Sequence, residues 1–239
     1  MRKYEIAGRV IAIDSDNQAL AEECGAFRYR GDKPAEAVFS VTPQRFAQEC
    51  DLWLAAYREE IESWLLAKSM FSWLMSHDAM LLHASAVAMD GRAYLFVAPS
   101  GTGKSTHAAL WRQRFGPDRA TVLNDDKPLI RLDGQGRFQV CGSPWCGKEH
   151  LRVNAEVPLQ AVCRLVQGTE NRISLLSPGD AALCVLSQTY LPETAERLDK
   201  GLALIDRLVG AIPVYSLECT ISEEAAALAW AAMKGESAP

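Results

Sequence analysis

The sequence lacks a long apolar run, an excess of positive charge and a Cys-x-x-Cys pair. Its 239 residues carry a formal net charge of −5, which argues against a general affinity for nucleic acid or for anionic membranes. Because no long apolar run follows the N-terminus, we expect a cytoplasmic protein with neither a signal peptide nor a membrane span. Internal repeats and low-complexity linkers are also absent from the sequence.

Seven cysteines are scattered through apolar segments, which is typical of reduced thiols in a cytosolic protein. Only Cys141 and Cys146 lie close together, and no further cysteine or histidine pair is near them. That spacing does not match most zinc sites, so we expect no metal site there. With 49% hydrophobic and 23% charged residues, the chain has an ordinary globular composition and is long enough for one or two domains.

Residues 93–110 have the pattern of a phosphate-binding loop between a strand and a helix. Residues 94–97 have strand composition, and residues 105–115 contain no Gly or Pro. In the P-loop motif, backbone amides surround an anion, a lysine reaches the outer phosphates and a hydroxyl binds Mg²⁺. The alternative is a glycine-rich turn that binds nothing, and the flanking strand and helix disfavour it. The expected nucleotide-binding residues are Pro99, Ser100, Gly101, Thr102, Gly103, Lys104, Ser105 and Thr106, after Ala98 at the first motif position.

Around this motif, the patterns predict a small N-terminal β layer, amphipathic helices and an α/β core with a mixed or antiparallel sheet. Residues 4–13 are expected to form a strand, and residues 43–76 one long or two consecutive helices. We interpret the tryptophans of these helices as core residues, with a ligand cage as the alternative. The predicted organisation is an N-terminal part at 1–76 and an ATP-binding catalytic domain at 77–239.

Asp90-Gly91 predicts a tight hairpin turn between strands over residues 80–87 and 93–97. Glycine 101 and glycine 103 are expected to adopt positive φ values that direct amides toward one anion. Further elements are expected as strands at 121–123, 128–132, 137–141, 159–166, 172–176 and 214–217, and as helices at 178–190, 193–209 and 223–233.

Asp125 and Asp126 directly follow an expected buried strand, where many nucleotide-binding proteins place an aspartate that helps hold the metal. Two adjacent carboxylates can divide the work, one holding Mg²⁺ and the other accepting a proton from an attacking hydroxyl. The sequence leaves open which does which, and a solvated turn is the alternative. If the predicted hairpin forms, His83 emerges beside the phosphate chain, although a histidine in an apolar strand is often only a core or edge residue.

The catalytic core of the HPr kinase/phosphorylase family resembles two stretches of this chain. These are Leu-Leu-His-Ala-Ser-Ala-Val-Ala-Met-Asp-Gly-Arg-Ala-Tyr-Leu-Phe-Val-Ala-Pro-Ser-Gly-Thr-Gly-Lys-Ser-Thr at 81–106 and Val-Leu-Asn-Asp-Asp at 122–126. The P-loop region of ATP-dependent phosphoenolpyruvate carboxykinases is similar as well. The resemblance implies that Lys104 and Ser105 bind phosphate and metal, that Asp125 and Asp126 serve as metal ligand and base in either order, and that His83 lies at the active centre.

The departures from these families narrow the prediction. HPr kinases open their phosphate loop with Gly, where this chain has Ala98, a change that related loops tolerate. The chain is much shorter than a phosphoenolpyruvate carboxykinase, and the N-terminal part does not resemble the regulatory domain of HPr kinases. The chain is more similar to small HPr-kinase-like proteins, some found beside peptide-modification genes, whose relatives phosphorylate a serine hydroxyl of a peptide or of a free amino acid.

The loop at 142–150 (Gly-Ser-Pro-Trp-Cys-Gly-Lys-Glu-His) is interpreted as the acceptor or lid region. Lys148 would stabilise the charge of the transferring phosphoryl group, and Trp145 would cover the substrate. The alternative is a hairpin-end loop with an anchoring tryptophan. Cys146 is not expected to act as a nucleophile, because phosphoryl transfer requires none.

The sequence thus predicts a kinase that uses ATP and Mg²⁺ to phosphorylate a hydroxyl, with a serine of a peptide or protein, or a small molecule such as free serine, as the expected acceptor. We expect no nucleic-acid or membrane partner, and the sequence leaves a homo-oligomer open. The alternatives are a phosphorolytic or carboxykinase-like phosphotransferase and an ATP-sensing module without turnover.

Overall fold

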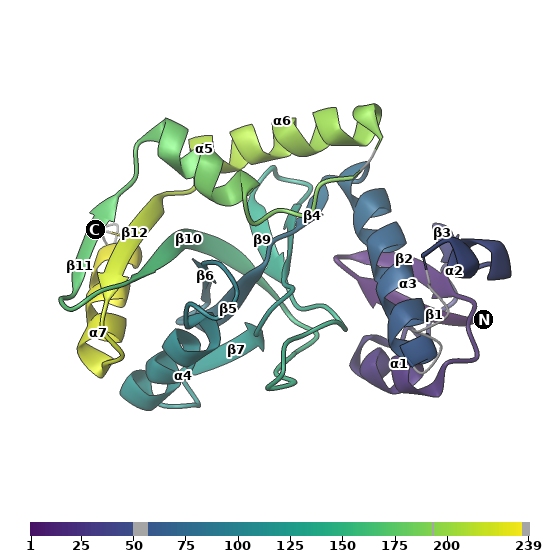
Figure 1. The fold of residues 1–239 in the computed structure, drawn as a ribbon, viewed down its shortest axis with the longest axis horizontal. Helices are drawn as coiled ribbons and strands as arrows, with labels where there is room; N and C mark the ends of the chain where they lie inside the picture. The colour runs from purple at the N-terminus through teal and green to yellow at the C-terminus, as the bar shows by residue number, and fades with distance from the viewer. Residues whose placement is uncertain (50–56, 193, 236–239) are drawn as a thin grey trace.

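The computed structural model describes residues 1–49, 57–192 and 194–235. These residues form a mixed α/β fold with a three-stranded sheet near the N-terminus and a nine-stranded mixed sheet that carries most of the chain. Figure 1 shows the small sheet and α1 to α3 on one side of the molecule and the large sheet, with its helices, on the other. None of the helices in the described ranges is long and apolar enough to cross a bilayer.

The small sheet begins with a hairpin that the sequence pattern did not separate. β1 (Arg2–Ile6) and β2 (Arg9–Ile13) pair antiparallel. The prediction of one strand over 4–13 is wrong, because Ala7 and Gly8 take φ values of 50° and 72° and reverse the chain. β3 (Ala37–Phe39) pairs parallel with β2, and α1 (Gln18–Glu23) lies between these strands in the chain.

Two helices follow the small sheet, α2 (Pro43–Glu49) and α3 (Arg58–Met75), as one of the predicted alternatives allowed. The core interpretation of the tryptophans is wrong for Trp64, which is 44% exposed. Trp73 is partly buried and packs edge-on against Phe39, with ring centroids 5.8 Å apart. Trp53 lies outside the described residues. The six cysteines in the described part are free thiols, and Cys50 lies outside that part.

The large sheet has the strand order β4-β8-β9-β10-β6-β5-β7, and β12 joins it through β10 and pairs in turn with β11. Asp90 and Gly91 have φ values of 53° and 73°, so the predicted tight turn is confirmed, and β5 and β6 form the predicted hairpin. The strands are β4 (Ala79–Leu81), β5 (Ala84–Met89), β6 (Arg92–Val97), β7 (Ala120–Asn124), β8 (Leu129–Leu132), β9 (Phe138–Cys141), β10 (Glu156–Gln167), β11 (Arg172–Leu175) and β12 (Val214–Cys219).

Residues 80–87 do not form one strand as predicted. β4 pairs with β8, whereas β5 pairs with β6 and β7, so Leu82 and His83 mark a change of partner between them. The His83 N–H instead donates to the Gln188 carbonyl at 2.8 Å. The helix predicted at 178–190 ends earlier, at Leu186. The residues that follow it leave the helix and pair with Leu82 and His83.

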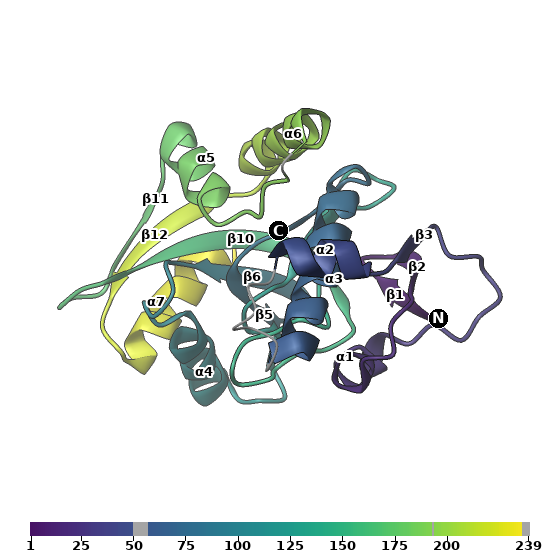
Figure 2. The ribbon, with the colours of Figure 1, turned by 45° about the vertical axis from the view of Figure 1, so that its right-hand side comes forward.

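Four helices cover the two faces of the large sheet (Figure 2). Along β6, Leu95 and Val97 join the core beneath α5 and α6, whereas Tyr94 and Phe96 join the core beneath α4 and α7. This alternation is the period-two pattern of a strand buried on both faces. The helices are α4 (Lys104–Phe115), α5 (Pro178–Leu186), α6 (Ala195–Ala211) and α7 (Glu223–Met233).

A further core joins the small sheet and α3 to β4, β8 and the buried Trp145. The predicted boundary between 1–76 and 77–239 falls between α3 and β4, and this division stays a prediction.

The directions of the central strands bring three chain segments to one edge of the large sheet. β5 is antiparallel to both β6 and β7, so β6 and β7 run the same way. The end of β6, the end of β7 and the start of β5 therefore meet. These points carry the glycine-rich loop at 98–103, the Asp125-Asp126 pair and His83.

Candidate active site

The glycine-rich loop (98–103) connects β6 to the first turn of α4. Gly101 and Gly103 have φ values of 80° and 113°, which confirms the predicted left-handed backbone. Gly103 is the N-cap of α4, and because it has no side chain the first-turn N–H groups of the helix are not capped by it. These N–H groups and the positive end of the helix dipole lie at the loop.

Lys104 is buried at the start of α4, with 7% of its surface exposed. Its Nζ donates to the Ala98 carbonyl across the loop at 2.9 Å. Burial lowers the pKa of Lys104, the negative charge of Asp126 opposes this shift, and the positive charge of Lys127 adds to it. Lys104 and the Asp126-Lys127 pair are therefore close enough to influence each other electrostatically. The next residue, Ser105, is exposed.

Asp125 lies just past the end of β7 and is only 2% exposed. Its Oδ1 accepts the Gly147 N–H at 2.6 Å. Its Oδ2 is buried and has no hydrogen-bond partner within the described part of the chain. An unpaired buried carboxylate oxygen is costly, typically by at least about 1–3 kcal/mol. The arrangement therefore favours a cation or a donor beside Oδ2.

A cavity of about 470 Å³ brings two of the three predicted metal ligands together, because Ser105 and Asp125 line it and Asp126 does not. Glu149 and Arg112 lie on its wall as well. A second cavity, of about 420 Å³, adjoins the glycine-rich loop and is lined by apolar side chains such as Leu110 and Leu165 together with polar ones such as Thr106.

Among the residues that the structure describes, no three His, Cys, Asp or Glu side chains cluster in a way that could hold a metal ion. A magnesium ion does not need such a cluster, because it is often held by one or two carboxylates together with substrate phosphates and water. Ser105 and Asp125 fit that donor set.

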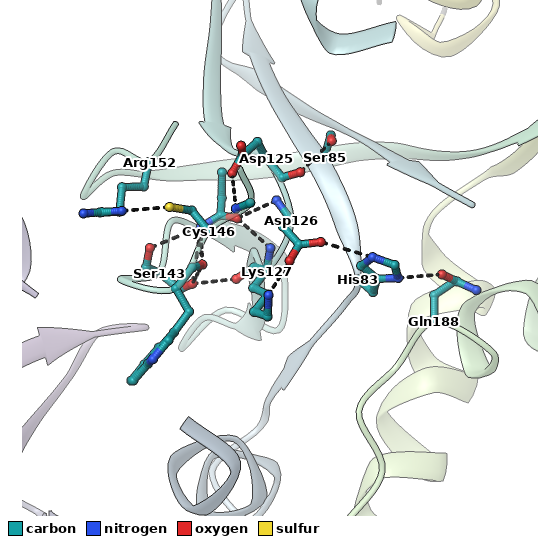
Figure 3. A network of polar contacts seen from close by, with 12 residues as sticks. His83, Ser85, Asp125, Asp126, Lys127, Ser143, Cys146, Arg152 and Gln188 are labelled. Carbon is teal, nitrogen blue, oxygen red and sulfur yellow. Dashed lines mark hydrogen bonds and ion pairs between the residues drawn. The ribbon is translucent and has the colours of Figure 1, made fainter. Parts of the chain in front are cut away.

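Asp126 lies at the centre of a polar network that includes His83 and Lys127 (Figure 3). His83 Nε2 is 3.1 Å from Asp126 Oδ1, and the Lys127 ammonium pairs with Oδ2. Burial alone would raise the pKa of Asp126, but the hydrogen bonds and positive charges of His83 and Lys127 outweigh it and hold the pKa well below its usual range. Asp126 is therefore held as a carboxylate.

The other ring nitrogen of His83 faces a residue far away in the sequence. Nδ1 lies 3.2 Å from Gln188 Oε1, in the segment that follows α5. Gln188 also accepts the His83 N–H through its carbonyl at 2.8 Å. The imidazole is thus held from both ends between Gln188 and Asp126, as the close-up shows.

Asn124 organises the site, although our sequence reasoning did not select it. Its Oδ1 accepts the N–H groups of Asp126 and Lys127 at 2.9 and 2.6 Å. Its Nδ2 donates to the carbonyls of Ser143 and Trp145 at 3.1 and 3.0 Å. Its position directly before Asp-Asp-Lys-Pro could have indicated this role, because an Asn side chain often accepts a hydrogen bond from the backbone N–H two residues later.

The loop at 142–150 is anchored by Trp145. This tryptophan is 7% exposed, donates through Nε1 to Ser63 Oγ at 3.0 Å and packs edge-on against Phe71. The anchoring interpretation is therefore correct, and the interpretation of Trp145 as a substrate cover is wrong. Burial raises the pKa of the Cys146 thiol despite the hydrogen bond from Arg152, which does not favour a nucleophile.

Lys148 follows Gly147 in the same loop and is exposed. Within the described ranges it makes no hydrogen bond or ion pair, so the structure leaves its predicted contact with a phosphoryl group untested.

The other predicted residues fall into two adjoining groups. Ser105 and Asp125 line one cavity, and His83 contacts Asp126 beside Lys104.

The family described as SynChlorMet cassette protein ScmC has a model that matches residues 58–225 of this chain. The chain belongs to the ScmC family. The ScmC match extends from α3 into α7 and includes the glycine-rich loop and the Asp125-Asp126 pair. The family description states no activity.

No curated protein sequence matches the chain. Among solved structures, the HPr(Ser) kinase/phosphatase from Coxiella burnetii is similar, with a TM-score of 0.34 and 11% sequence identity, over 65% of this chain and 99% of that chain. The similarity to this kinase/phosphatase is thus low in both sequence and structure.

Proposed function

We propose that this chain is an ATP-dependent phosphotransferase that moves the γ-phosphoryl group to a hydroxyl of a peptide, a protein or a small molecule such as free serine. The observation that carries the proposal is the cavity shared by Ser105 and Asp125, with an unpaired buried carboxylate oxygen at the end of β7. Its position next to a glycine-rich loop and a buried lysine is what phosphate and metal binding would require.

In this proposal, Pro99 to Thr106 hold the phosphates. The loop amides and the uncapped start of α4 supply donors, and Lys104 would exchange the Ala98 carbonyl for a phosphate oxygen. The partly apolar cavity of about 420 Å³ beside the loop would take the nucleoside of ATP. Ser105 Oγ and Asp125 Oδ2 would hold Mg²⁺, which when bound would neutralise charge on the phosphates.

Asp126 would act on the acceptor. Its carboxylate is ionised and fixed by His83 and Lys127, so it can accept a hydrogen bond from the acceptor hydroxyl and then its proton. The acceptor oxygen forms a bond to the γ-phosphorus as the bond from that phosphorus to the bridging oxygen breaks and leaves ADP. Because phosphoryl transfer depends mainly on positioning and charge, a weakly basic but well-oriented carboxylate suffices.

His83 and Lys148 would have supporting roles. His83 fixes the orientation of Asp126 and is itself fixed by Gln188. Lys148 is exposed directly after Gly147, whose N–H contacts Asp125, so it would be able to reach the transferring phosphoryl group.

The test is incubation of the full chain with ATP and Mg²⁺ against free hydroxy amino acids and serine-containing peptides, read by mass spectrometry. We expect a phosphorylated acceptor with the wild type, and a loss of on the order of 100-fold or more with Asp125→Asn and with Asp126→Asn. Asp118→Asn is the matched control, because Asp118 is exposed in the turn at the far end of α4.

The proposal fails if ATP is not consumed and no acceptor gains a phosphate. Formation of pyrophosphate from a phosphoserine compound and inorganic phosphate, without forward transfer, would favour the phosphorolytic alternative. Tight ATP binding with no transfer in any variant would favour the sensing module.

A further inference from the structure

His107 is a buried polar side chain near the start of α4 that has no role in the proposed phosphoryl transfer. It is 3% exposed, and its ring packs edge-on against Phe96 with centroids 4.6 Å apart. It also lines the cavity of about 420 Å³ beside the glycine-rich loop. A buried polar group at a cavity wall is placed to contact whatever fills that cavity.

Trp111 decides which nitrogen of the His107 ring carries the proton. The Trp111 Nε1–H group, one helical turn further along α4, donates to His107 Nε2 at 3.2 Å. An indole N–H can only donate a hydrogen bond, so Nε2 must present its lone pair to it. The proton of the imidazole therefore lies on Nδ1, which makes Nδ1 a hydrogen-bond donor.

The donor on His107 Nδ1 is unused by the protein and accessible from the cavity. Nδ1 has no hydrogen-bond partner among the residues that the structure describes. In those same ranges, Asp125 Oδ2 is the only fully buried side-chain nitrogen or oxygen without a partner, so Nδ1 is not sealed from its surroundings. An unused donor at the wall of a cavity favours a ligand that carries an acceptor there.

The rest of the cavity suits a flat ring with a few polar atoms. Leu110 and Leu165 supply apolar walls, and the glycine-rich loop borders the same cavity. Each lining segment lies well inside the described ranges 57–192 and 194–235. The adenine ring combines an apolar face with acceptor nitrogens at its edge, so it matches both the walls and the single unused donor.

We propose that His107 recognises the base of the nucleotide, with its Nδ1–H donating to an acceptor nitrogen of the adenine ring. This inference rests on the proposed function, which puts the nucleoside of ATP in the cavity, and it names the group that selects the base. Trp111 is a positioning residue, because it keeps the donor proton on Nδ1. A base that lacks the matching acceptor leaves the donor unpaired and binds more weakly.

The first measurement needs no nucleotide. The chain has four histidines, so ¹⁵N NMR of the imidazole rings, compared with His107→Gln, identifies the signals of His107. We expect a protonated Nδ1 and an unprotonated Nε2 in the wild type, and a mixture of both neutral forms in Trp111→Phe. A wild-type ring that is protonated on Nε2 instead overturns the proposal.

The second measurement is isothermal titration of the full chain with Mg²⁺ and ATP, or with ATP analogues in which N1, N3 or N7 of adenine is replaced by CH. We expect one analogue to bind the wild type on the order of tenfold more weakly than ATP. His107→Leu should bind ATP and that analogue equally, because the donor is gone. His107→Gln can accept from Trp111 and donate an amide N–H, so it should restore part of the difference. His77→Leu is the matched control, because His77 follows α3 and does not line the cavity.

Inorganic tripolyphosphate with Mg²⁺ separates this proposal from the proposed function. If ATP binds no more tightly than tripolyphosphate, base recognition fails while phosphate binding at the loop stands. If neither binds, the phosphotransferase function fails and base recognition fails with it. The proposal is also overturned if all three analogues bind like ATP, or if His107→Leu discriminates as strongly as the wild type. Melting curves check the folding of each variant, and the wild-type comparison of analogues gives a reading even if His107→Leu does not fold.

Discussion

The Gly147 N–H donates to Asp125 Oδ1 at 2.6 Å, and this contact leaves Asp125 Oδ2 buried at the cavity it shares with Ser105. The loop at 142–150 thereby orients the carboxylate of Asp125, the residue that follows β7. The close approach is possible because residue 147 has no side chain. A Cβ there would lie 3.0 Å from Asp125 Oδ2 and 3.2 Å from the Asp126 Cβ.

Gly147→Ala should therefore displace the carboxylates with little loss of stability. We expect phosphoryl transfer to fall by on the order of tenfold or more, because small misplacements of reacting groups are costly. Gly179→Ala is the matched control, since a Cβ at 179 meets nothing within 4 Å. Full activity in Gly147→Ala with an unchanged melting temperature would show that the loop does not orient Asp125.

Asp125→Asn should affect stability differently with and without metal. In EDTA, the substitution removes a buried charge while its amide oxygen can still accept the Gly147 N–H, so we expect the free energy of unfolding to stay equal or to rise by about 1–3 kcal/mol. Addition of Mg²⁺ and ADP should raise the melting temperature of the wild type but not of the variant. Equal stabilisation of both proteins would contradict the assignment of Asp125 as metal ligand.

Asp126 should give the protein a measurable acid sensitivity. Its folded-state pKa is lowered, with the hydrogen bonds from His83 and Lys127 outweighing burial. The stability it contributes is therefore fully present above its unfolded pKa, near 3.9, and is lost as the pH falls through that value toward the folded pKa. The difference in melting temperature between the wild type and Asp126→Asn, measured from neutral pH downward, should begin to shrink near pH 4 and keep shrinking at lower pH. A constant difference would argue against this ion-pair network.

His107 should make the free energy of unfolding depend on pH in a higher pH range than Asp126 does. It is buried in α4, accepts the Trp111 Nε1–H at 3.2 Å and has its pKa lowered from 6.5 to about 4 by burial. Since the folded state favours the neutral ring, its contribution is complete above pH 6.5 and is lost as the pH falls from 6.5 to about 4, by up to about 3 kcal/mol.

His107→Gln is the comparison for this effect, because it cannot gain a charge in that range. Urea unfolding at several pH values should show a shallower pH dependence for the variant than for the wild type. Identical slopes would show that His107 is already exposed to protonation in the folded protein.

The sequence by itself determined the features that depend on neighbouring residues. Asp90-Gly91 reverses the chain because both residues tolerate positive φ, and Gly101 and Gly103 take the predicted left-handed backbone for the same reason. The Asp125-Asp126 pair follows its strand because apolar residues end there. Ala7-Gly8 was missed because an alanine with positive φ is rare and gives no local warning.

Only the tertiary structure decided which side chains meet across long separations in the chain. Trp145 is fixed by Ser63, and His83 is held between Asp126 and Gln188. Asp125 and Asp126 are adjacent and chemically identical, so no local pattern could separate their roles. Their surroundings differ because successive residues point in different directions: Asp125 turns inward to Gly147, and Asp126 turns toward the cations of its network.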